Sequence, residues 1–183
     1  MLVTSSRFLA AFFLVAIVPT IALAQQSLER IHAGIVDEYN NIEHVGAGEL
    51  LAMSPSDVLL FDVREQDEFT VSHIQGSIQV DPDIDEDAFA ERYGSNLEGK
   101  TAIFYCSVGR RSSQLASKLD EFIQEKNGVG AANLIGGIFQ WRNESRPLVS
   151  INRVPTNQVH PYNWYWGRLI EDKGAISYQP QSD

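Results

Sequence analysis

Residues 101–112 read TAIFYCSVGRRS, and this stretch decides both the fold class and the candidate site. Its first five residues form an apolar run that is typical of a strand buried on both faces. The only cysteine of the chain, Cys106, follows directly. A loop containing Gly109 can turn its backbone N–H groups toward the sulfur, and a helix starting near Ser112 then points its positive end at the same place. This layout is typical of a reactive thiolate.

The residues beside Cys106 support this interpretation. Arg110 and Arg111 add positive charge next to the sulfur, and the thiolate is the form that attacks. A lone cysteine at a strand end is most often a small buried hydrophobe. A structural cysteine, however, needs neither a glycine nor two arginines beside it, and the chain offers no second cysteine for a disulfide. We therefore predict that Cys106 is a nucleophile.

The N-terminus has the architecture of a secretory signal peptide. Arg7 is the only charge before Glu29, residues 8–18 are almost wholly apolar, and residues 22–24 (ALA) have the small-x-small pattern of a cleavage site. The apolar core is short for a membrane span of about 20 residues. We predict a signal peptide that is cleaved after Ala24, with an uncleaved membrane anchor as the alternative.

Cleavage would leave 159 of the 183 residues, which suits one domain in the periplasm or outside the cell. These residues include 13 basic and 24 acidic ones, a net charge of −11 with neutral histidines. Such a surface argues against nucleic acid and anionic membranes as partners. A membrane remains a partner only if the signal stays uncleaved.

Apolar runs alternate with amphipathic stretches along the rest of the chain, and this alternation predicts an α/β domain. We expect a mainly parallel central sheet with helices on both faces, and sites in such sheets lie beyond the carboxyl ends of the strands. Asp62 and Cys106 both fall there. Strands are expected at residues 42–45, 58–61, 78–80, 100–105 and 132–135, and helices at residues 27–39, 48–53, 65–69, 81–93, 113–126 and 138–143.

An aromatic cluster, formed by Tyr162, Trp164, Tyr165 and Trp166, marks the less patterned C-terminal part of the chain. Large aromatic side chains tend to be buried, so we expect the cluster to pack onto the domain. The alternative is a partner-docking patch, because exposed contiguous aromatics mark interaction sites.

Three segments resemble the signature motifs of single-domain rhodaneses, a sulfurtransferase family. Residues 62–77 contain DVR, EF and HIQGS and are similar to the family's DVRxxxEF…GHIxGA. Residues 106–112 match CxxGxRS position by position, and residues 134–141 resemble LxGGxxxW. The departures are Ser72 and Ser145, each of which stands where the family usually has glycine.

The resemblance implies a rhodanese-like α/β fold and divides the chain into four parts. These are a signal peptide at residues 1–24, an N-terminal helical extension at 25–41, a rhodanese-like domain at 42–148 and an aromatic-rich C-terminal extension at 149–183.

The resemblance also implies a mechanism. Cys106 would take the outer sulfur of a small anionic donor such as thiosulfate, forming a persulfide, and pass the sulfur to a thiol, a protein or another nucleophilic acceptor. No cofactor is implied, and no cluster of residues has metal-ligand spacing. A ring of loop N–H groups would hold the anionic sulfur, and its members are Ser107, Val108, Gly109, Arg110 and Arg111.

Other polar residues are expected to support the loops. We predict this role for Asp62, Arg64 and Ser112, with an ion pair between Arg64 and Glu68. His73 is expected to be structural, because a thiolate activated by dipoles needs no general base.

Two alternatives remain open. One is a rhodanese-fold binding or sulfur-carrier module that docks a partner protein through the aromatic extension. The other, ranked third, is a phosphatase-like activity. The loop from Cys106 to Arg111 has six residues, whereas related phosphatases use a loop one residue longer, so a larger oxyanion has less room here.

Overall fold

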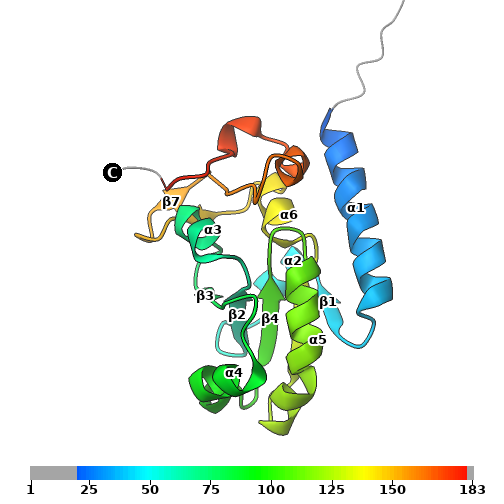
Figure 1. The fold of residues 1–183 in the computed structure, drawn as a ribbon, viewed down its shortest axis with the longest axis vertical. Helices are drawn as coiled ribbons and strands as arrows, with labels where there is room; N and C mark the ends of the chain where they lie inside the picture. Colours follow the sequence, from blue (N-terminus) through cyan, green and yellow to red (C-terminus); the bar gives the residue numbers. More distant parts are fainter. Residues whose placement is uncertain (1–19, 181–183) are drawn as a thin grey trace, which may run out of the picture.

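A parallel β-sheet forms the centre of the computed structural model, which describes residues 20–180 (Figure 1). Within this range, five strands are arranged in the order β1-β5-β4-β2-β3, and every pairing between them is parallel. The middle strand, β4, therefore has hydrogen-bonded neighbours on both sides. The strands are β1 (Glu43–Val45), β2 (Val58–Asp62), β3 (Ile78–Gln79), β4 (Thr101–Tyr105) and β5 (Gly130–Leu134).

Helices cover both faces of the sheet, as predicted. On β4, Ala102 and Phe104 pack into one hydrophobic cluster with α4 and α5, whereas Ile103 and Tyr105 pack into a second cluster with α6 and the C-terminal extension. All four side chains are fully buried, so the apolar run is a strand buried on both faces. The helices of this region are α2 (Ala47–Ala52), α3 (Gln66–Val71), α4 (Glu86–Tyr93), α5 (Arg110–Glu125), α6 (Gly137–Asn143) and the 3-10 turn η1 (Gly94–Asn96).

Within the domain, two helix starts differ from the prediction by three residues or more. Helix α4 begins at Glu86 rather than near residue 81, because the Asp85 side chain caps it by accepting a hydrogen bond from the Ala88 N–H at 2.8 Å. Helix α5 begins earlier than predicted, at Arg110, because Gly109 adopts a left-handed conformation (φ +104°) directly before it. Arg110 therefore lies in the first turn of a helix rather than in a loop.

Helix α1 (Thr20–Glu38) stands alongside the domain and begins before the predicted start at residue 27 (Figure 1). Leu28 and Ile35 are buried on its inner side. The predicted cleavage point after Ala24 falls inside this helix, and residues 1–19 lie outside the described part of the chain, so the signal peptide stays a prediction. None of the described helices is long and apolar enough to cross a membrane.

The C-terminal extension packs onto the domain through aliphatic side chains. Val159, Ile170 and Ala175 are buried in the cluster that contains Ile103 and Tyr105. The extension consists of β6 (Leu148–Val149) paired antiparallel with β7 (Pro155–Thr156), followed by the 3-10 turns η2 (Trp166–Leu169) and η3 (Lys173–Ala175).

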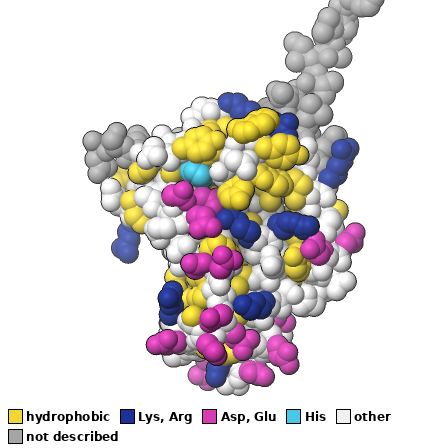
Figure 2. Space-filling view, in the orientation of Figure 1, with side chains coloured by type: hydrophobic (Ala, Val, Ile, Leu, Met, Phe, Trp, Pro, Cys, Tyr) yellow, Lys and Arg dark blue, Asp and Glu magenta, His cyan; other side chains and the backbone are white. Residues whose placement is uncertain are grey.

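Most of the aromatic cluster of this extension is exposed, so the expectation that the cluster packs onto the domain is met only by Trp166, which is half-buried against the core. Trp164 is 73% exposed, and Tyr162 and Tyr165 are about half exposed. The buried contact of the extension with the domain is made by aliphatic side chains and not by these three aromatics. Figure 2 shows hydrophobic side chains gathering on the upper part of this face, where the extension and α1 lie, whereas acidic side chains gather at the opposite end.

Candidate active site

Cys106 follows the middle strand of the sheet at its carboxyl end. The residue is buried, with 2% of its surface exposed. Strand β4 lies between β5 and β2, so both neighbouring strands point their carboxyl ends toward the same edge. Sites of open α/β sheets form at this edge. The predicted position of the nucleophile agrees with this arrangement.

The backbone between Cys106 and α5 curls around the sulfur. The Gly109 N–H donates a hydrogen bond to Cys106 Sγ at 3.2 Å. Gly109 has φ +104°, which a residue with a Cβ rarely adopts, and this turn aims the N-terminus of the 16-residue helix α5 at the sulfur. A buried anion at Sγ would therefore meet an N–H donor and the positive end of a helix dipole.

The N-terminus of α6 fixes the same loop from behind. The Ile138 N–H donates to the Cys106 carbonyl at 2.9 Å, and the Phe139 N–H donates to the Ser107 carbonyl at 3.1 Å. Gly137 permits this approach: a Cβ there would lie 2.3 Å from the Cys106 carbonyl oxygen, and its φ is +55°. The second glycine of the third motif, Gly137, thus lets α6 hold the Cys106 loop, a role that the sequence analysis did not assign.

A buried polar residue on β5 supports the loop from the side. The Asn133 side chain accepts a hydrogen bond from Ser112 Oγ at 2.7 Å and contacts His44 Nδ1 at 3.3 Å. Ser112 is fully buried, so its predicted supporting role has a concrete partner. The sequence analysis missed Asn133, and the signal available was a polar residue inside an otherwise apolar strand.

Arg111 is held in place by three groups. Its Nη2 donates to Glu68 Oε2 at 2.8 Å and to Ser107 Oγ at 3.2 Å, and its guanidinium lies over the ring of Tyr162, 4.9 Å from the centroid. Burial lowers the pKa of Arg111, but the negative charges of Cys106 and Glu68 outweigh burial and raise it overall. Arg111 is thus a fixed cation beside the sulfur, with one carboxylate already paired to it.

The predicted ion pair between Arg64 and Glu68 is wrong. The Glu68 carboxylate binds Arg111, and Arg64 reaches only the Glu68 carbonyl, at 3.5 Å. Arg64 pairs instead with Asp62, donating from Nη2 to Oδ2 at 2.6 Å and from Nε to Oδ1 at 2.9 Å. This partner is favoured because the two side chains are two residues apart at the turn after β2 and can meet in a bidentate geometry.

The Asp62–Arg64 pair is completely buried. Burial lowers the pKa of Arg64, and the Asp62 carboxylate more than compensates, so the pKa lies above its ordinary value. Arg64 Nη2 also donates to the Ser72 carbonyl at 2.7 Å. The pair thereby connects the end of β2 to the end of α3, and its support of the site stays a prediction.

The side chain of Arg110 lies at the rim of the site and pairs with α1. Its Nη1 and Nη2 both donate to Glu38 Oε2 of α1, at 2.6 and 2.7 Å. Both side chains are about half exposed. Arg110 therefore connects the reactive loop to α1.

His73 packs as a structural residue. Its Nδ1 lies 3.2 Å from the Phe69 carbonyl, its ring stacks on the Phe69 ring at 3.9 Å, and burial lowers its pKa. Among residues 20–180, no group of His, Cys, Asp and Glu side chains could hold a metal ion.

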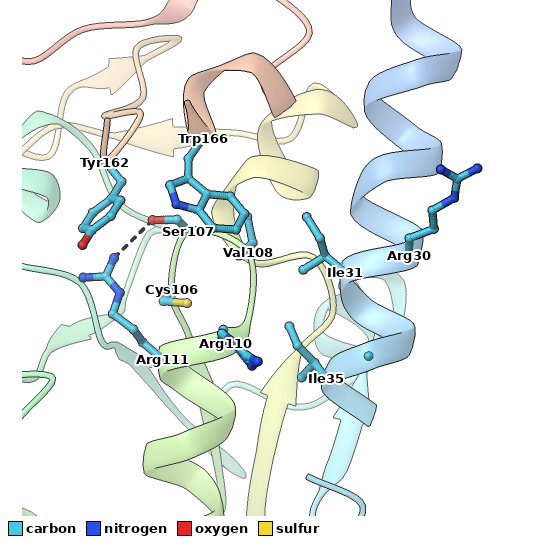
Figure 3. A pocket seen from close by; sticks show the side chains of 11 residues that line it. Arg30, Ile31, Ile35, Cys106, Ser107, Val108, Arg110, Arg111, Tyr162 and Trp166 are labelled. Atoms are coloured by element: carbon cyan, nitrogen blue, oxygen red, sulfur yellow. Dashed lines mark hydrogen bonds between the residues drawn. The ribbon is translucent and has the colours of Figure 1, made fainter. Parts of the chain in front are cut away.

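A cavity of about 460 Å³ opens above Cys106. Its floor is the loop, including Ser107 and Val108, but its walls come from both extensions. Ile31 and Ile35 of α1 point toward it from one side, and Tyr162 and Trp166 of the C-terminal extension lie over it (Figure 3). The sequence analysis predicted the helix at residues 27–39 and the aromatic cluster but did not place either at the site. Their place at the site depends on contacts between distant segments.

Together, the central parallel sheet and a buried cysteine whose sulfur accepts the Gly109 N–H at the carboxyl end of the middle strand define an α/β protein with a thiol site at the edge of its sheet. Residues 46–144 match the rhodanese-like domain, and the chain belongs to that family. Membership indicates a sulfurtransferase type of function at the level of the family.

Solved structures with a similar fold have various descriptions. A protein of unknown function from Rhodopseudomonas palustris, described as a possible tyrosine phosphatase, is 25% identical with a TM-score of 0.50, covering 64% of this chain and 92% of its own. A thiosulfate sulfurtransferase from Pseudomonas aeruginosa is 18% identical (TM-score 0.48), covering 73% of this chain and 23% of its own. A human single-domain sulfurtransferase is 24% identical (TM-score 0.40), with coverages of 54% and 93%. No curated protein sequence matches the chain.

Proposed function

We propose that this protein is a sulfurtransferase that carries sulfane sulfur as a persulfide on Cys106, with thiosulfate or a related anion as donor. The observation that carries the proposal is the hydrogen bond from the Gly109 N–H to Cys106 Sγ at the N-terminus of α5. This geometry stabilises negative charge on sulfur both before and after transfer. Hydrogen bonds to the loop backbone hold these N–H groups in place before the reaction.

Loading is a nucleophilic displacement at sulfur. The Cys106 thiolate attacks the outer sulfur of thiosulfate, a bond forms between Sγ and that sulfur, and the S–S bond of thiosulfate breaks with its electron pair on the leaving sulfite. The outer sulfur of the persulfide then carries the negative charge. The cavity above the loop is open to that position.

Unloading is the reverse type of displacement. An acceptor thiolate or cyanide attacks the outer sulfur, and the electron pair of the broken S–S bond returns to Cys106. Because the chain has one cysteine, no second thiol of its own can resolve the persulfide. Turnover therefore depends on an acceptor that enters through the cavity.

The direct test incubates the protein with thiosulfate and cyanide and measures thiocyanate. The wild-type protein should produce thiocyanate, and Cys106→Ser should reduce the rate to background, because a serine hydroxyl is a far weaker nucleophile toward sulfur. Cys106→Ala serves as a second variant, and thermal unfolding of both variants checks that they fold. Thiocyanate production that persists in folded variants would contradict the proposal.

A binding or sulfur-carrier module is the second candidate, and the exposed aromatics Tyr162, Trp164 and Tyr165 favour it. Removing the whole extension is a poor test, because Val159 and Ile170 belong to the core. Trp164→Ala with Tyr165→Ala is better. If this double variant loses a partner protein yet keeps full thiocyanate production, docking is a separate function of the extension.

The phosphatase-like alternative has a simple test. Hydrolysis of p-nitrophenyl phosphate should stay at background, because the six residues from Cys106 to Arg111 leave less room for a phosphate group than the longer phosphatase loop. Hydrolysis that depends on Cys106 would reverse the ranking of the two activities.

We also propose that residues 1–24 export the protein. The proposal rests on Arg7, the apolar segment and the small residues before Gln25. Expression of the full chain in a bacterium, followed by fractionation and intact mass, tests it. Mature protein that begins at Gln25 in the periplasm supports export with cleavage. Full-length protein in the cytoplasm would contradict export, and full-length protein in the membrane fraction would indicate the uncleaved anchor.

A further inference from the structure

The cavity above Cys106 is larger and more apolar than a small inorganic anion requires. Its volume of about 460 Å³ lies within the range of about 300–1,000 Å³ that is usual for small-molecule sites. Cavities of this size and with apolar walls are typical of sites for organic ligands. The side chains that point toward the cavity from α1 are Ile31 and Ile35, and the indole of Trp166 lies across from them (Figure 3).

The apolar walls lie outside the residues that match the family. Ile31 and Ile35 belong to α1, and Tyr162 and Trp166 belong to the C-terminal extension, whereas the family match covers residues 46–144. The Arg110–Glu38 ion pair and the buried side chain of Ile35 hold α1 against the loop. The apolar part of the cavity is therefore a feature of this chain's own extensions.

The charges around the cavity favour a ligand with a single negative charge. Arg111 is paired with Glu68, and Arg110 is paired with Glu38. The third arginine at the cavity, Arg30, directs its guanidinium away from Cys106 (Figure 3). The loop N–H groups and the α5 dipole are then the main positive features that face the sulfur, and their summed charge is a fraction of a full cation. These positive features compensate the two negative charges of a dianion such as thiosulfate less well than a single negative charge.

We propose that the preferred sulfur donor is an organic thiosulfonate, R–SO₂–S⁻, whose apolar R group lies between α1 and Trp166 while its anionic sulfur meets the loop N–H groups. The inference deepens the proposed function and rests on it. Ile31, Ile35 and Trp166 determine the specificity for R, and burial of R favours binding because apolar surface leaves water.

The transfer balances without any further reactant. The Cys106 thiolate attacks the terminal sulfur of R–SO₂–S⁻, the bond from Sγ to that sulfur forms, and the bond between the two donor sulfurs breaks. Its electron pair leaves with the sulfinate R–SO₂⁻. The product is the Cys106 persulfide, as with thiosulfate, so cyanide removes its outer sulfur as thiocyanate in both cases.

The test compares benzenethiosulfonate with thiosulfate as donors, with cyanide as acceptor. The measured quantity is the ratio of their kcat/KM values, after subtraction of the rate with Cys106→Ser. We expect the ratio to fall about tenfold in Ile31→Ala, since loss of apolar wall weakens binding of R by a factor of this order. Ile151→Ala is the matched control: it removes the same atoms from a half-exposed side chain outside the cavity, and it should leave the ratio unchanged. The two donors differ in intrinsic reactivity, but this difference is the same in every variant. It therefore cancels when the ratio of kcat/KM values is compared between variants.

A second variant protects the test from a folding defect. Trp166→Ala truncates the opposite wall and should lower the same ratio, and thermal unfolding shows which variants are folded. If both variants turn over the two donors with the wild-type ratio, the inference is wrong and sulfur transfer stands. If the wild-type protein yields no thiocyanate from either donor and Cys106 gains no sulfur in intact mass, both the proposed function and the inference are overturned.

Discussion

The family domain and the two segments that flank it contribute to one site in different ways. Residues 46–144 supply Cys106, the loop that surrounds its sulfur and the α6 N-terminus that holds the loop. Helix α1 and the C-terminal extension supply no group that contacts Sγ through a described hydrogen bond, but they wall the cavity above it. On the proposed function, the domain would determine what the sulfur can do, and the two flanking segments would determine what reaches it.

The two regions also differ in how their charges are arranged. In the domain, Asp62 and Arg64 form a pair that is fully buried. At the junction with α1, the Arg110–Glu38 pair is about half exposed. Breaking a buried pair leaves an uncompensated charge in a medium that cannot solvate it, whereas water screens an exposed pair. Variants in the two regions should therefore differ strongly in their effect on stability.

The largest expected effect follows from the buried pair. Asp62→Asn should lower the free energy of unfolding by about 3–5 kcal/mol, because Arg64 would keep its charge without a carboxylate partner. Urea unfolding at pH 7 measures this loss. Asp57→Asn makes the same chemical change at an exposed position and should leave stability almost unchanged. Equal effects of the two variants would contradict the structural role of the pair.

The second effect isolates the contact between α6 and the reactive loop. Gly137→Ala should cost about 3 kcal/mol and most of the activity, because the new Cβ would lie 2.3 Å from the Cys106 carbonyl oxygen. Gly76 also has a positive φ (+84°) but has open space around its Cβ position. Gly76→Ala should therefore cost only the backbone strain, about 1 kcal/mol. Unfolding free energies and thiocyanate rates of the two glycine variants separate the steric clash of the new Cβ from the backbone strain. Equal losses in both variants would rule out the clash.

The family domain could be predicted from the sequence largely because its signals are local. The run before Cys106 is continuously apolar after Thr101, which is typical of a strand buried on both faces. Ala102 and Phe104 do face one cluster, and Ile103 and Tyr105 face the other. The error in the start of α5 has a local cause as well. Gly109 turns the chain into the helix at once, and a propensity pattern does not give the φ of a single glycine.

The walls of the cavity could not be predicted, because they depend on packing between distant segments. The sequence predicted the helix at residues 27–39, which carries Ile31 and Ile35, but a helical pattern does not say which part of the domain a helix meets. The partner of Glu68 was missed for the same reason. Arg64 is four residues away from Glu68 in the sequence, whereas Arg111, the actual partner, is 43 residues away.

A smaller effect concerns pH and the extension. His160 Nδ1 accepts a hydrogen bond from the Tyr162 N–H at 3.1 Å, so this nitrogen carries no proton. Burial lowers the pKa of His160 below its ordinary value of 6.5. The unfolded chain therefore binds the proton first as the pH falls below about 6.5, and stability is lost in that window. The urea concentration at the unfolding midpoint should decrease as the pH is lowered from 7.5 to 5.5. This decrease should be smaller in His160→Gln. An unchanged slope in this variant would exclude His160 as the cause.

The smallest effect is expected at the exposed junction. Glu38→Gln releases Arg110, so the cavity rim gains one net positive charge, and the KM for thiosulfate should fall about twofold with a stability change below about 1 kcal/mol. Salt should abolish the difference, since the site is solvent-exposed. Glu91→Gln changes the same charge on α4, outside the cavity, and serves as the control. A KM that falls equally in both variants would show a general charge effect instead of a local one.

The most direct test of the central claim is the intact mass of the protein after exposure to a sulfane-sulfur donor. The account predicts that the wild-type protein gains the mass of one sulfur atom, that cyanide or a thiol removes it, and that Cys106→Ser gains nothing. A wild-type protein that gains no sulfur from thiosulfate or benzenethiosulfonate, or a gain that persists in Cys106→Ser, would contradict the account.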